Sequence, residues 1–154
     1  MSEAKRIADQ LRRSQQGAAW HGPAVGELLP GTDAVLAQRQ LIPGAHNIWE
    51  LVLHITAWQV AMLRAVKGET MPQLDGQEDW PVAGHTEQDW RDAVERLERV
   101  NDELVASLAS FPDERLGDTV PGRDYSFYFL FHGVTQHNLY HAGQIAMLKA
   151  AARA

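Results

Sequence analysis

The fold is decided by residues 126–152, SFYFLFHGVTQHNLYHAGQIAMLKAAA. Apolar residues recur in this stretch at helical spacing and no proline interrupts it, so it predicts one long helix beginning near Ser126. Between Asp124 and Lys149 there is no formally charged side chain. Because a helix at the surface normally carries a polar face, we expect this one to be enclosed by other helices or by a second subunit.

Working outward from this segment, the same periodicity predicts three further helices. Asn47 is a good N-cap with Glu50 three residues later, and Gly68 is a suitable end for the helix that follows. Thr86 can cap another helix, which Pro112 closes. The predicted main helices are 3–19, 48–67, 87–111 and 126–152, with short helices at 23–29 and 34–38 and irregular connections at 69–85 and 113–125. The sequence therefore predicts an all-α fold.

Length and composition limit the class of protein. The chain has 154 residues, which predicts a single domain over 1–154. It contains no cysteine, which excludes disulfides, iron–sulfur clusters and Cys-ligated zinc. Its net charge of −6 argues against nucleic acid and against an anionic membrane as partners. With no apolar run of 18 residues and no apolar segment near the N-terminus, a cytoplasmic location is expected.

Three histidines suggest a metal site. His137 and His141 are four residues apart and so lie on one side of the last helix, which is also its apolar side. His54 lies at the edge of the apolar face of the 48–67 helix. Together they would offer three imidazole nitrogens to Zn²⁺ or Ni²⁺ and leave a position open for water or substrate. The alternative is that they are core histidines, each bonded to a carbonyl or hydroxyl group.

The surroundings of these histidines exclude two known kinds of metal site. Asn138 follows His137, where a zinc protease of the His-Glu-x-x-His type has its catalytic Glu. A carboxylate-bridged di-iron bundle needs Glu-x-x-His pairs, and no Glu stands three residues before any of the three histidines.

Two motifs resemble those of a known family. Residues 48–54, IWELVLH, and 133–145, GVTQHNLYHAGQI, are similar to the signatures of the DinB-like (YfiT-like) metal-binding four-helix bundles, and WHGP at 20–23 extends the likeness. The resemblance implies an up-down-down-up bundle with a long crossover, often a homodimer, whose metal ligands are His54, His137 and His141. It also implies relatives that are divalent-metal-dependent enzymes and use thiols such as bacillithiol or mycothiol, as S-transferases or an isomerase.

Four more residues are candidates for the surroundings of the metal. Glu50 stands one turn before His54 and can hold an imidazole or a water on the metal, or simply cap its helix. Trp58, one turn after that histidine, can line a pocket or belong to the core. Gln144 lies near His137 around the last helix and can touch the site or a neighbouring helix. His21, in a loop, can line the pocket mouth.

The leading functional hypothesis is a metal-dependent enzyme that activates a small thiol or water, as a thiol S-transferase or a hydrolase. A low-molecular-weight thiol would be its co-substrate, and a small molecule its substrate. The alternatives are a non-catalytic, stress-related protein that binds a metal or ligand, and a bundle whose metal is structural. The sequence leaves open whether the protein is an enzyme. We also expect a homodimer, because the last helix carries a second apolar face with Phe129, Tyr140 and Met147.

Overall fold

The computed structural model describes residues 1–153, and within them the regular structure is helical, with no β-strand. The helices are α1 Glu3–Gln16, α2 Val25–Leu28, α3 Ala34–Gln38, α4 Ile48–Val66, α5 Gly76–Asp79, α6 Glu87–Ala109 and α7 Phe127–Ala151, with a 3-10 turn at Asp113–Arg115. This confirms the predicted all-α fold.

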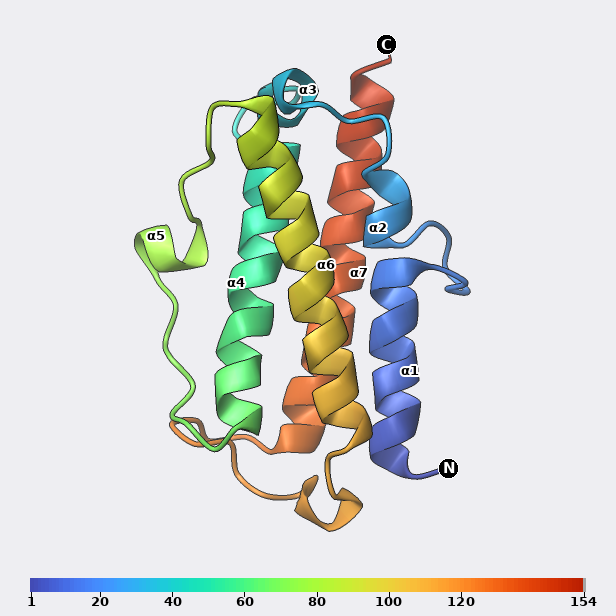
Figure 1. Ribbon diagram of the computed structural model, residues 1–154, viewed down its shortest axis with the longest axis vertical. Helices are drawn as coiled ribbons and strands as arrows, with labels where there is room; N and C mark the ends of the chain where they lie inside the picture. Colours follow the sequence, from blue (N-terminus) through green and yellow to red (C-terminus); the bar gives the residue numbers. More distant parts are fainter. Residues whose placement is uncertain (154) are drawn as a thin grey trace.

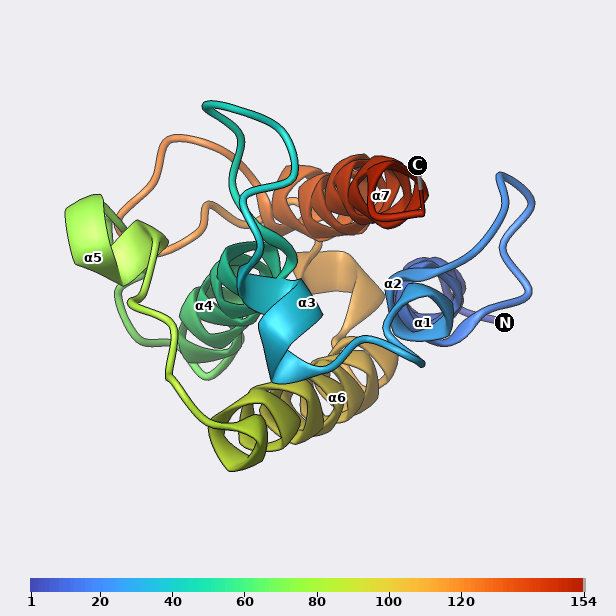
Figure 2. The ribbon, with the colours of Figure 1, turned by 90° about the horizontal axis from the view of Figure 1, so that it is seen from above.

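The four long helices form a bundle in up-down-down-up order (Figure 1). α4 packs against α6 and α7, and α1 packs against the same two helices, so that all four surround one core (Figure 2). Since α4 and α6 run in the same direction, their connection has to travel back along the bundle. Residues 67–86 do so along the outside of α4 and include the single turn α5 (Figures 1 and 2). The four-helix bundle with its long crossover is thereby confirmed.

Side-chain caps explain where the long helices begin. Asn47 Oδ1 accepts from the Glu50 N–H (2.9 Å), and Glu50 Oε2 accepts in return from the Asn47 N–H (3.0 Å). Thr86 Oγ1 accepts from the Asp89 N–H (3.1 Å), and Ser126 caps α7 through the Phe129 N–H. These bonds satisfy backbone donors that have no partner inside the helix. The predicted starts of the three helices are therefore confirmed.

Several predicted boundaries were wrong. α1 ends at Gln16 instead of Ala19, because Gly17 (φ 117°) and Ala18 (φ 59°) leave the right-handed helical region. α2 begins at Val25, two residues after Pro23. α6 ends at Ala109 instead of residue 111. The connection at 69–85 contains α5, and the one at 113–125 contains the 3-10 turn.

The core consists of two apolar clusters with buried polar side chains at their boundary. Along α7, Val134 belongs to one cluster and Ala142 to the other. Between them Asn138 Nδ2 donates to Ser14 Oγ on α1 (3.1 Å), and Asn138 Oδ1 accepts from Gln59 Nε2 on α4 (3.3 Å). Because a buried polar group is costly unless it is hydrogen-bonded, these bonds favour one axial position of α7 relative to α1 and α4. The three histidines lie at this level of the bundle.

One side of α7 stays exposed within the single chain. Phe129, Tyr140 and Met147 are 65%, 67% and 66% exposed, whereas Leu130 and Ile145 on the inner side are buried. The other helices of the chain thus enclose α7 only in part. Enclosure of the exposed face by a second subunit stays a prediction.

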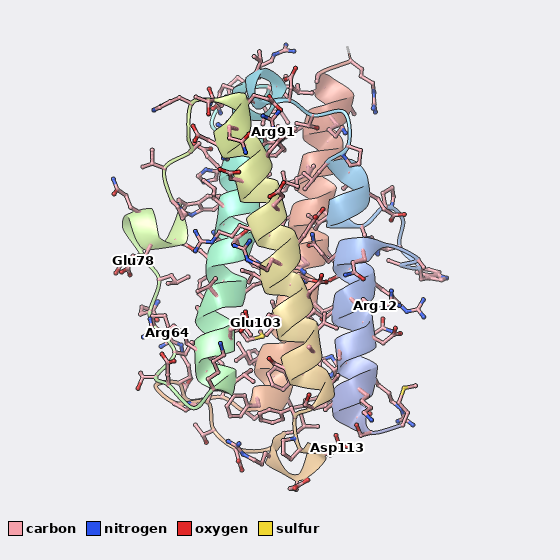
Figure 3. All side chains as sticks on the ribbon, viewed as in Figure 1. Arg12, Arg64, Glu78, Arg91, Glu103 and Asp113 are labelled. Carbon is pink, nitrogen blue, oxygen red and sulfur yellow. The ribbon has the colours of Figure 1, made fainter. Side chains whose placement is uncertain are left out.

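Charged side chains gather on the outside of the bundle (Figure 3). Asp113, below the start of α1, accepts from the backbone N–H groups of Glu3 (2.8 Å) and Ala4 (2.9 Å). It thereby satisfies free donors at the N-terminus of α1 and links this helix to the connection between α6 and α7. In residues 1–153, no helix combines the length and apolar character needed to cross a membrane.

Candidate metal centre

The structure brings His54 of α4 together with His137 and His141 of α7. His137 Nε2 lies 3.0 Å from His54 Nε2 and 3.1 Å from His141 Nε2. His54 and His141 are buried, and His137 is half-buried. We call these three residues the histidine triad. Within the part of the chain that is described, it is the group of His, Asp and Glu side chains that can hold a metal ion.

The backbone of α5 fixes the orientation of His54. Its Nδ1–H donates to the carbonyl oxygen of Asp79 (2.8 Å), and one oxygen of the Asp79 carboxylate lies 3.1 Å from the same nitrogen. Trp58 Nε1–H donates to that carboxylate (2.7 Å) and holds it in place. Because a carbonyl oxygen can only accept, Nδ1 carries the proton and Nε2 presents a lone pair to the triad.

The other two imidazoles differ in how they are held. His141 Nδ1–H donates to Gln144 Oε1 (2.6 Å), so its Nε2 also presents a lone pair. His137 Nδ1 is buried and has no hydrogen-bond partner among the described residues. Two of the three ligands thus have the outer hydrogen bond that orients metal-binding histidines.

Burial keeps the triad uncharged near neutral pH. Loss of hydration lowers the pKa of His54 and His141, and lowers that of His137 to about 3. The other imidazoles of the triad lower the pKa of His137 further, since they would repel its positive form. Neutral imidazole is the form that binds metal ions, so all three side chains are in the ligating state.

The spacing of the nitrogens matches a divalent cation. A tetrahedral ion with metal–nitrogen bonds of about 2.0–2.1 Å separates its ligand atoms by about 3.3 Å, and an octahedral one by about 2.9 Å. The two observed separations of 3.0 Å and 3.1 Å lie between these values. A single proton on His137 Nε2 could form a hydrogen bond to only one of the other two nitrogens at a time. A cation at the centre of the triad would instead bind the lone pairs of all three nitrogens. The donor set therefore fits a metal ion.

Two site residues were missed by the sequence analysis, namely Asp79 and Trp80 in the crossover. The ring of Trp80 stacks on His54 (3.9 Å between centroids) and, on its other side, on His46 (3.4 Å). His46 Nδ1 in turn contacts Glu50 Oε2 (3.1 Å). A tryptophan directly after an acidic residue, in a connection rich in Pro and Gly, was the signal that could have drawn attention to this segment.

The four further candidate residues lie in different places relative to the triad. Gln144 binds His141, and Trp58 supports the Asp79 carboxylate with its ring centroid 6.1 Å from that of His137. Glu50 caps α4 and contacts His46, without a hydrogen bond to the triad. His21 was wrongly placed at the pocket mouth: it is exposed in the loop between α1 and α2, across the bundle from α5 (Figure 2).

An apolar pocket of about 230 Å³ adjoins the triad. His137 forms part of its wall, together with side chains of α4, α7 and the two lower connections. A small molecule in this pocket would therefore lie against one of the three imidazoles of the triad.

Comparison with known proteins agrees with the geometry. The model of the DinB superfamily matches residues 9–145, a range that includes the whole triad. No curated protein and no solved structure gives a match to the chain. The match confirms the resemblance that the two sequence motifs indicated.

Proposed function

The chain belongs to the DinB superfamily, and from this premise we propose that it is a metal-dependent enzyme acting on a small molecule. His54, His137 and His141 would hold one divalent ion, with zinc or nickel as the best candidates. The observation that carries the proposal is the convergence of three Nε2 atoms, two of which have their outer nitrogen already engaged. This arrangement suits metal binding better than it suits three independent core histidines.

A bound divalent ion lowers the pKa of a thiol or water beside it and so supplies a thiolate or hydroxide near neutral pH. The protein's own residues favour a thiol. Both acidic side chains near the triad are engaged, Asp79 with Trp58 and Glu50 with His46, so neither is free to act as a base for water. A thiolate needs no such base, which supports thiol S-transferase chemistry with a low-molecular-weight thiol as co-substrate.

The second candidate is a non-catalytic protein that binds a metal or a ligand, for example in a stress response. The observation in its favour is Trp80, whose ring lies flat on His54 and covers that side of the triad. A purely structural metal is less well supported, because the cluster offers three ligands in the described residues and a structural zinc site normally has four.

The test is metal analysis of the purified protein, followed by a thiol-conjugation screen with and without chelator. In cobalt-substituted protein, adding a small thiol should produce a sulfur-to-metal charge-transfer band. The band should be absent from His141→Ala and retained in His85→Ala, whose imidazole is exposed and outside the triad. If the metal is bound and thiols leave the spectrum unchanged, hydrolysis or simple metal binding replaces the transferase proposal.

We propose further that the protein works as a cytoplasmic homodimer without nucleic-acid or membrane partners. The absence of cysteine and the net charge of −6 support this environment. The exposed face of α7, with Phe129, Tyr140 and Met147, supports a second copy as partner, because exposed apolar patches on helices are common at such interfaces.

A further inference from the structure

We infer that the apolar pocket beside His137 binds an uncharged, single-ring aromatic group of the substrate. The inference rests on the proposed function, since it assigns the pocket to the molecule on which the metal site would act. It adds the chemical class of that molecule, which neither the triad nor the family match specifies.

The lining of the pocket excludes a charged ligand. No Asp, Glu, Lys or Arg side chain lines the pocket among the described residues, and its one imidazole, that of His137, belongs to the triad. A carboxylate or phosphate entering the pocket would lose hydration without gaining a positively charged side chain or an array of hydrogen-bond donors from the lining.

The polar groups at the wall are already engaged. Trp58 Nε1–H donates to the Asp79 carboxylate (2.7 Å), and the Tyr125 hydroxyl donates to Met71 Sδ (3.8 Å). These side chains therefore present their apolar surfaces to the pocket. A ligand with many hydroxyl groups would find few partners there, which disfavours sugars and similar molecules.

The shape and the types of side chain favour an aromatic ring. A cavity of 150 Å³ is known to hold benzene, so about 230 Å³ has room for one ring with a small substituent. Trp58, Tyr125 and Phe129 offer ring faces and edges, and Met62 and Met71 offer sulfur atoms that interact well with aromatic rings.

Gly133 supplies part of this space. A glycine in a helix interior makes the helix less stable than an alanine would. Gly133 does not have the positive φ that would require glycine. A Cβ atom built at this position meets no heavy atom within 4 Å, and the residue lines the pocket. The missing side chain thus leaves the wall of the pocket open, and a larger residue would fill the pocket without disturbing the core.

The experiment compares two ¹⁹F NMR probes that differ in charge, 4-fluorotoluene and 4-fluorobenzoate. We expect 4-fluorotoluene to bind about tenfold more tightly than 4-fluorobenzoate. Gly133→Leu should weaken its binding by about tenfold or more, whereas Ala150→Leu, at an exposed position of the same helix, should leave it unchanged. In cobalt-loaded protein the bound fluorine should also be broadened by the nearby paramagnetic ion.

Three results would overturn the inference: equal binding of the two probes, no binding of 4-fluorotoluene, or full binding by Gly133→Leu. Binding is measured in metal-free and metal-loaded protein, so that failure of the two proposals can be distinguished. If 4-fluorotoluene binds and Gly133→Leu excludes it while no metal is taken up, the proposed function fails and the pocket's preference stands. If metal and thiol bind normally and the probe does not, only the pocket assignment fails.

Discussion

Replacing Gln144 by Ala should weaken metal binding without unfolding the protein. Gln144 Oε1 accepts the Nδ1–H of His141 at 2.6 Å, and this bond both orients the ring and leaves its Nε2 free for the metal. Loss of such an outer hydrogen bond typically costs 10–100-fold in metal affinity, or about 1.4–2.7 kcal/mol. Because His141 is buried, with 5% exposure, a water molecule can replace the lost acceptor only in part. We therefore expect a loss of at least about tenfold.

The assay is equilibrium competition for Zn²⁺ against a chromophoric chelator near neutral pH, with circular dichroism as a check on folding. Gln136→Ala is the matched control, since Gln136 is an exposed glutamine on the same helix. Gln144→Glu retains an acceptor oxygen and should keep the affinity close to that of the original protein. The reasoning is refuted if folded Gln144→Ala binds zinc with unchanged affinity, or if Gln136→Ala loses as much.

Three other predictions concern the triad, its titration and the exposed side of α7. Replacing any one histidine of the triad by Ala should sharply lower the metal content of the purified protein, because two imidazoles hold an ion poorly. The control variant His85→Ala should keep its metal. Full metal content in His137→Ala would contradict the proposed site. The free energy of unfolding of the metal-free protein should fall as the pH drops below about 6.5, since the unfolded chain then takes up protons that the buried triad, with its lowered pKa values, does not. Urea midpoints at about pH 7.5 and about pH 5 measure this, and equal midpoints would count against neutral buried imidazoles. Light scattering should show a dimer at micromolar concentration. Tyr140→Lys should shift the equilibrium toward the monomer, because it places a charge on the exposed apolar face of α7. A monomeric parent protein would rule out this interface.

Local sequence determined most of the helices and the common side of His137 and His141. Caps such as Asn47 with Glu50 act through neighbouring residues, and the spacing of His137 and His141 fixes their common side of one helix. The failures along the chain were also local: the end of α1 depended on the backbone conformation of Gly17 and Ala18, which helical periodicity does not reveal. The grouping of His54 with the other two histidines was a hypothesis from their places on apolar helix faces, which the family resemblance supported, because spacing within one helix says nothing about which helix lies opposite.

Tertiary structure alone decided which residues of the crossover surround the triad. Asp79 and Trp80 lie about 25 residues after His54 in sequence, in a segment without periodicity, and they reach it only because the crossover returns along the outside of α4. The loop between α1 and α2, which contains His21, lies on the other side of the bundle (Figure 2). A helix sets the direction of its own side chains through repeated backbone hydrogen bonds, which are local. The course of a long connection depends on packing between distant residues, so it becomes visible only in the folded chain.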